Sequence, residues 1–119
     1  MWWLMVLMLA SPAVGQRPFC DFGIGVAALR EAQARLAAPV TGLVSGREEG
    51  LAVAALLDTA RERFNACGCS RLAEWVNEAA RLAEQAGYEA SAMRIAGTFR
   101  QAGFRAQQAR QAMDGTGCR

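Results

Sequence analysis

The chain has 119 residues, a formal net charge of +2 and 53% hydrophobic residues. This length allows a single domain, and so small a net charge does not indicate nucleic-acid binding. Histidine is absent, which removes the commonest general base and metal ligand, and there is no phosphate-binding, dinucleotide-binding or haem-attachment motif. We therefore expect a non-catalytic protein without a cofactor.

The first residues are typical of a secretory signal peptide. An apolar run over residues 2–10 is followed by Ala13 and Gly15, small residues at the positions that precede a cleavage site. The run is roughly half of the ~20 residues needed to cross a bilayer, which argues against a permanent transmembrane span. The alternative is a buried N-terminal helix, since no basic residue precedes the run. We expect residues 1–15 to be the signal peptide and residues 16–119 a single helical domain that is periplasmic or secreted.

The rest of the chain is predicted to form helices, and no sustained stretch alternates β-branched and polar residues. The first helix is expected to start after Asp21 and to stop before Pro39. The second is expected to open at an S-x-x-E capping box of Ser45 and Glu48 and to end at Gly68. Apolar residues at helical spacing predict the buried faces: Phe22, Val26, Leu29 and Leu36 in the first helix, and Val53, Leu56, Leu57, Ala60, Phe64 and Cys67 in the second.

Two more helices are predicted in the second half of the chain. Ser70 is expected to cap the third helix and Gly87 to end it, and the fourth is expected to begin near Tyr88. Gly97 and Gly103 interrupt the fourth helix and mark either a close helix contact or a bend. The predicted buried faces are Leu72, Trp75, Val76, Ala79, Leu82, Ala83 and Ala86 in the third helix, and Tyr88, Ala92, Ile95, Phe99, Ala102, Ala106, Ala109 and Met113 in the fourth.

Short connections between four helices favour antiparallel neighbours, so the predicted fold is an all-α, up-down-up-down four-helix bundle. In that topology Cys20 precedes the first helix, Cys67 and Cys69 flank the turn between the second and third, and Cys118 follows the fourth. All four cysteines are then expected at one end of the bundle.

An even number of cysteines in an exported chain predicts two disulfides. A Cys67–Cys69 bridge would close a strained ring, which leaves two pairings open: Cys20–Cys67 with Cys69–Cys118, or Cys20–Cys69 with Cys67–Cys118. Either pairing closes loops of about 50 residues, worth about 4 kcal/mol each in the chain-entropy model. The alternative is a soft-metal site, in which the four thiolates hold zinc or copper.

The fourth helix carries the candidate interaction surface. Arg94, Arg100, Arg105 and Arg110 follow one another with no acidic residue between them, and Phe104 falls outside the predicted buried face. These residues predict docking on an envelope protein or an anionic surface. The alternative is a solvated face beside acidic residues of the third helix. The expected function is thus an exported, disulfide-stapled interaction module, with soft-metal binding as the alternative.

Overall fold

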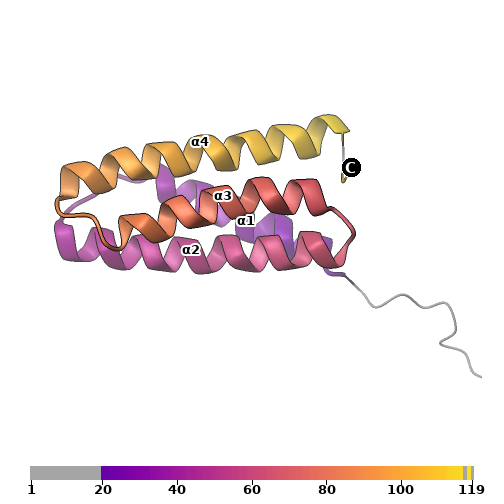
Figure 1. The fold of residues 1–119 in the computed structure, drawn as a ribbon, viewed down its shortest axis with the longest axis horizontal. Helices are drawn as coiled ribbons and strands as arrows, with labels where there is room; N and C mark the ends of the chain where they lie inside the picture. Colours follow the sequence, from indigo (N-terminus) through magenta and orange to yellow (C-terminus); the bar gives the residue numbers. More distant parts are fainter. Residues whose placement is uncertain (1–19, 117, 119) are drawn as a thin grey trace, which may run out of the picture.

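The computed structural model describes residues 20–116 and 118, and every regular element within them is a helix. In chain order the helices are α1 (Phe22–Ala37), α2 (Leu43–Ala66), α3 (Ser70–Ala86) and α4 (Ala92–Thr116). The four helices lie side by side, and the connections between them lie at the two ends of the molecule (Figure 1). The predicted all-helical class is therefore confirmed for this part of the chain. The predicted signal peptide, residues 1–15, lies outside the described residues.

Helix α1 begins directly after Asp21, as predicted, but the aspartate side chain does not cap it. Asp21 has a left-handed backbone (φ 56°) and makes no side-chain cap hydrogen bond. Its carboxylate instead accepts a hydrogen bond from Arg63 Nη1 of α2, at 3.3 Å. The helix start is thus held by a contact with the neighbouring helix.

The predicted capping box of α2 is wrong. The helix begins at Leu43, two residues before Ser45, and its N-cap is Gly42 without a side-chain hydrogen bond. The Ser45 hydroxyl lies 3.3 Å from that of Thr41. Leu43 packs against the core, so burial of its side chain favours a helix that starts earlier than the capping pattern indicates.

The starts of α3 and α4 also differ from the sequence expectation. Helix α3 has Cys69 as its N-cap, and Ser70 is the first helical residue rather than the cap. Gly87 is confirmed as the C-cap of α3. Helix α4 begins at Ala92 instead of near Tyr88, because the Ser91 hydroxyl accepts a hydrogen bond from the Arg94 backbone N–H at 3.2 Å and caps the helix there.

The core is lean, because more than half of its buried apolar residues are alanine. Its largest fully buried side chains include Phe64, Leu29, Leu57 and Ile95. Trp75 was predicted to belong to this core and does not: 36% of its surface is exposed, since it lies at the edge of the buried face that contains Leu72, Val76 and Ala83. Tyr88 is likewise wrong as a core residue, because it precedes α4 and is exposed.

Small residues allow α2 and α3 to pack closely. A Cβ atom added to Gly50 would lie 2.8 Å from the Ala83 carbonyl oxygen and 3.0 Å from the Ala86 Cβ, which is closer than such atoms normally approach. Gly97 and Gly103 differ, because an added Cβ would lie 3.7 Å from the Arg100 Nη2 at Gly97 and 3.9 Å from the Leu36 Cβ at Gly103, both ordinary contact distances. The sequence predicted a close helix contact or a bend at Gly97 and Gly103. The close contact is found at Gly50, between α2 and α3.

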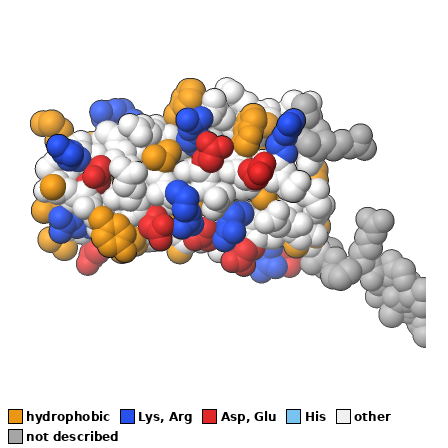
Figure 2. All heavy atoms as spheres, viewed as in Figure 1, with side chains coloured by type: hydrophobic (Ala, Val, Ile, Leu, Met, Phe, Trp, Pro, Cys, Tyr) orange, Lys and Arg blue, Asp and Glu red, His pale blue; other side chains and the backbone are white. Residues whose placement is uncertain are grey.

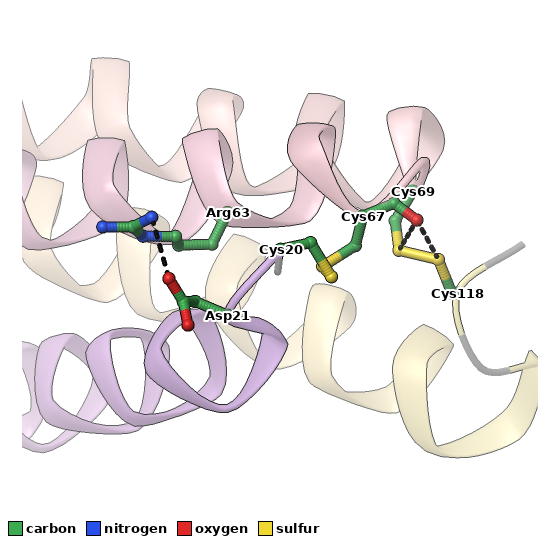
Figure 3. The surroundings of a disulfide bond; sticks show 6 residues. All are labelled: Cys20, Asp21, Arg63, Cys67, Cys69 and Cys118. Carbon is green, nitrogen blue, oxygen red and sulfur yellow. Dashed lines mark hydrogen bonds and ion pairs between the residues drawn. A yellow bond between two sulfur atoms is a disulfide. The ribbon is translucent and has the colours of Figure 1, made fainter. Parts of the chain in front are cut away.

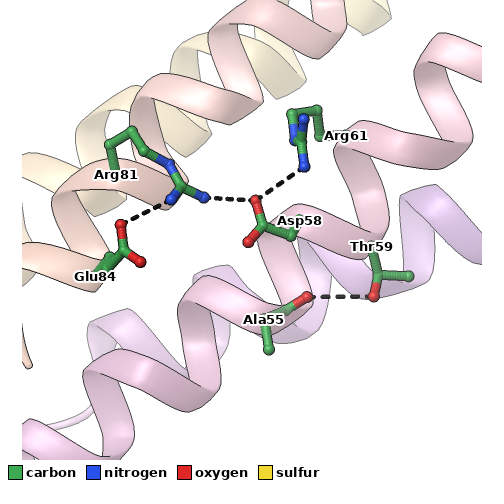
Figure 4. A network of polar contacts seen from close by, with 6 residues as sticks. All are labelled: Ala55, Asp58, Thr59, Arg61, Arg81 and Glu84. Carbon is green, nitrogen blue, oxygen red and sulfur yellow. Dashed lines mark hydrogen bonds and ion pairs between the residues drawn. The ribbon is translucent and has the colours of Figure 1, made fainter.

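Ion pairs join neighbouring helices at the surface. The guanidinium of Arg35 donates two hydrogen bonds to Glu49, from Nε at 2.7 Å and from Nη2 at 2.6 Å, and so links α1 to α2. The Arg35 hydrogen bonds lower the pKa of Glu49, and the carboxylate in turn raises the pKa of Arg35. Arg81 of α3 donates to Asp58 of α2 at 2.6 Å (Figure 4). These pairs add polar links to an otherwise apolar contact between helices.

Candidate functional site: the disulfide end and the surface of α4

The four cysteines form two disulfides at one end of the molecule. Cys20 is bonded to Cys67, and Cys69 is bonded to Cys118 (Figure 3). The expected gathering of the cysteines at one end is confirmed, and the structure has the first of the two pairings that the sequence left open. Each bridge joins the two ends of one helical pair: α1 with α2, and α3 with α4.

The turn between Cys67 and Cys69 brings the two bridges together. Gly68 has φ 82°, a left-handed conformation that favours glycine over residues with a side chain. The Cys67 carbonyl oxygen lies 3.9 Å from the Cys69 sulfur and 3.8 Å from the Cys118 sulfur (Figure 3). Cys69 is fully buried, whereas Cys20, Cys67 and Cys118 are partly exposed. The Cys69–Cys118 disulfide is therefore partly buried in the core.

The two disulfides occupy the four cysteines that a soft-metal site would need as thiolates. Metal binding by cysteine uses the thiolate, and a sulfur bonded to another sulfur carries no such charge. Within residues 20–116 and 118, no group of three or more histidine, cysteine or acidic residues could hold a metal ion. The oxidised form described here thus offers no support for the four-cysteine metal site.

On α4, three of the five predicted surface residues lie around one hollow. Arg100, Phe104 and Arg105 line it together with Gly97, Gln101 and Leu82, and its volume is about 480 Å³. Phe104 is 60% exposed, as expected from its place outside the buried face. Leu82 belongs to α3 and the other lining residues to α4, and Gly97 contributes no side chain. We refer to this feature as the α4 hollow.

Arg94 and Arg110 do not line the α4 hollow. Arg110 donates a hydrogen bond to Gln33 of α1 at 3.2 Å. Arg94 lies in the first turn of α4 and is exposed. Arg105 lies 3.9 Å from Glu78 of α3, a loose contact between two exposed side chains. Among the described residues, Arg105 is therefore the one candidate arginine of α4 that has an acidic neighbour on α3.

A second hollow lies between α1 and α4, and no sequence pattern indicated it. Its volume is about 450 Å³, and we call it the α1–α4 groove. Its lining combines apolar residues with two glutamines and one arginine: Leu36, Ala37, Ala38, Pro39, Val40, Ala96, Phe99 and Gly103, with Gln33, Gln107 and Arg100. The two hollows share Arg100, which therefore stands between them on the outer surface of α4.

The remaining exposed apolar residues include a group at the end opposite the disulfides. Val44 lies in the first turn of α2, Tyr88 in the connection before α4, and Met93 in the first turn of α4; all three are exposed. Figure 2 shows several apolar side chains at that end and a mixture of acidic and basic side chains along the visible face. Tyr88 could not be placed there from sequence, because it continues the helical spacing of the buried face of α4.

No helix among the described residues combines the length and hydropathy that a membrane crossing requires. Comparison of the chain with protein-family models, curated proteins and solved structures gave no significant match. The disulfide end, the α4 hollow and the α1–α4 groove are therefore the features on which a proposal about function can rest.

Proposed function

We propose that this chain is an exported, antiparallel up-down-up-down bundle that acts by binding and not by catalysis. Connections of five, three and five residues between packed helices support the antiparallel arrangement. Two disulfides at one end support an oxidising location, because such bonds persist in the periplasm and outside the cell. In this proposal the chain is periplasmic or secreted once residues 1–15 have been removed.

The interior of the described domain supports a non-catalytic role. Thr98 is the buried polar side chain identified there, and its hydroxyl donates a hydrogen bond to Glu89 at 2.7 Å. This hydrogen bond satisfies a buried polar group, and the chain has no histidine, the commonest general base. Binding through a surface is the role that remains for the exposed residues.

The exposed ring of Phe104, in the same hollow as two arginines, is the observation that carries the proposal. Arg100 and Arg105, the latter in loose contact with Glu78, line the α4 hollow together with the exposed ring of Phe104, and the hollow can accept a group from a partner. Arginine and aromatic residues are enriched among the residues that dominate binding energy. We propose that the partner is an envelope protein that presents acidic and apolar groups together.

The test compares binding by the wild type and by a Phe104→Ser, Arg105→Gln double variant. Arg30 is an exposed arginine of α1, so Arg30→Gln is a matched control that removes one charge elsewhere. Proteins cross-linked in the envelope should be lost from the double variant and retained by the control. Vesicles of phosphatidylglycerol form a separate arm of the experiment. Recovery of the same proteins by all three forms would contradict the proposal, as would equal binding of all three to the vesicles alone.

A further inference from the structure

We propose that the α1–α4 groove binds a small amphipathic anion, an apolar chain or ring that carries one carboxylate. The volume of the groove, about 450 Å³, falls within the range of roughly 300–1,000 Å³ that is usual for small-molecule sites. The inference concerns a ligand site on the side of α4 that faces α1. It adjoins the α4 hollow proposed above for a protein partner and shares only Arg100 with it.

The interior of the groove is apolar. Phe99, which is 4% exposed, and Leu36, which is 5% exposed, belong both to the core and to the groove lining. Val40 also packs against the core. Gly103 leaves the groove open, because an added Cβ would have the Leu36 Cβ, at 3.9 Å, as its nearest neighbour. An alkyl chain or ring can therefore enter where an ordinary side chain on α4 would have filled the space.

Polar side chains close one end of the groove. The Gln33 side-chain amide donates a hydrogen bond to the Gln107 side-chain oxygen at 2.9 Å, joining α1 to α4. Arg110 donates to the Gln33 side-chain oxygen at 3.2 Å, which fixes the orientation of that amide. Ala38, Pro39 and Val40, from the connection between α1 and α2, also line the groove. The lining of the groove therefore combines a polar bridge between α1 and α4 with part of the connection between α1 and α2.

Charge determines which kind of ligand fits. Arg100 lines the groove and is exposed, it has no acidic partner within 4 Å among the described residues, and no acidic residue lines the groove. A neighbouring hollow of about 230 Å³ is also lined by an arginine, Arg35, but this residue forms an ion pair with Glu49 in the same lining. The positive charge of the α1–α4 groove is therefore available to an anion, whereas that of its neighbour is already neutralised. A carboxylate beside Arg100 would form a charge-assisted hydrogen bond.

Octanoate is a suitable probe, because it combines an apolar chain with a carboxylate. Octanol is the control that has the chain without the charge, and acetate is the control that has the carboxylate without the long chain. Each is titrated into the disulfide-intact, isotope-labelled protein, and amide chemical shifts are followed by NMR. Octanoate should produce saturable shifts at Leu36, Val40, Phe99 and Gly103. Octanol should bind at the same residues roughly fivefold more weakly, because it lacks the charge that Arg100 recognises. Acetate should not shift these residues.

Two kinds of variant separate the apolar and charged parts of the site. Gly103→Leu fills the groove and should abolish the octanoate shifts without loss of thermal stability, since leucine favours a helix more than glycine does. Ala96→Leu is a second filling variant on the same helix. Arg100→Gln should weaken octanoate binding about fivefold and leave octanol binding unchanged. Arg94→Gln, which removes an exposed charge outside the groove, should bind octanoate as the wild type does.

Three results would overturn the proposal. The first is the absence of saturable octanoate shifts. The second is shifts that spread over exposed Tyr88, Met93 and Phe104, which would indicate non-specific contact with apolar surface. The third is octanoate binding by folded Gly103→Leu and Ala96→Leu with wild-type affinity. The double variant at Phe104 and Arg105 should retain octanoate binding, because neither residue lines the groove, so failure of this proposal is distinct from failure of the proposed protein partner.

Discussion

Replacing glycine by alanine at two helical positions should change stability in opposite directions. Alanine favours a helix over glycine by about 0.5–1 kcal/mol, so this substitution inside a helix stabilises a protein unless the added methyl group meets another atom. Gly50 of α2 and Gly103 of α4 differ in this respect. The added Cβ at Gly50 would lie 2.8 Å from the Ala83 carbonyl oxygen, whereas at Gly103 its nearest neighbour is the Leu36 Cβ, at 3.9 Å.

The magnitudes follow from these distances. At Gly50 the separation from the Ala83 oxygen is about 0.7 Å shorter than an ordinary contact of ~3.5 Å, and a backbone atom cannot rotate away. Overpacking of this kind costs about 1–3 kcal/mol, which exceeds the gain in helix propensity. We expect Gly50→Ala to lower the free energy of unfolding by about 1–2 kcal/mol. Gly103→Ala should raise it by about 0.5–1 kcal/mol, since the methyl group meets only the Leu36 Cβ, at an ordinary contact distance of 3.9 Å.

Guanidinium unfolding of the disulfide-intact proteins, followed by circular dichroism, measures both changes. The slope against denaturant should be equal in the two variants and the wild type, so that a shift in midpoint reports stability. A Gly50→Ala protein at least as stable as the wild type would refute the close approach of α2 and α3. Destabilisation by Gly103→Ala would show that the α1–α4 groove is filled at that position.

Three further predictions concern the bridges, the core and the ion pair. Replacing Cys20 and Cys67 by alanine removes a bridge with a sequence separation of 47 and should lower the free energy of unfolding by about 4 kcal/mol, measured by denaturant titration against the wild type. Phe64→Ala should lower the free energy of unfolding by about 3–5 kcal/mol and Trp75→Ala by about 1–2 kcal/mol in the same assay, because the first side chain is fully buried and the second is 36% exposed; equal losses would contradict this placement. The pKa of Glu49 is lowered in the folded protein, chiefly by its hydrogen bonds from Arg35. The stabilisation from this carboxylate is therefore present above the ordinary glutamate pKa and is lost as the pH falls through the lowered pKa of the folded protein. Glu49→Gln should therefore flatten the acid side of a stability–pH profile, and an unchanged profile would show that the ion pair does not stabilise the fold.

The spacing of apolar residues predicted the helices and most of their buried faces. In α2, for example, Val53, Leu57 and Phe64 recur at helical intervals and are all fully buried. The positions of helix starts were less predictable, because capping contributes only about 1 kcal/mol and burial can outweigh it. Leu43 illustrates this point, since it packs against the core although it precedes the predicted cap at Ser45.

The α1–α4 groove could not be predicted for a different reason. Its polar end depends on Gln33 meeting Gln107, two residues separated by 74 positions in the sequence. Their contact follows from the axial register of α1 against α4, which the pattern within either helix does not specify. The exposure of Phe104, by contrast, could be predicted, because it depends only on the position of that residue around its own helix.

Disulfide mapping tests most directly whether the two bridges staple the two helical pairs at one end. Trypsin leaves Cys67 and Cys69 on one peptide, residues 64–71, because no arginine or lysine lies between them. Both interhelical pairings therefore give one cluster of three peptides with the same mass, and electron-transfer fragmentation at Gly68 is needed to separate them. In protein recovered without reduction, fragments that contain Cys67 should carry the Cys20 peptide, and fragments that contain Cys69 should carry the Cys118 peptide. The reverse assignment, a Cys67–Cys69 bridge or four free thiols would contradict the structure.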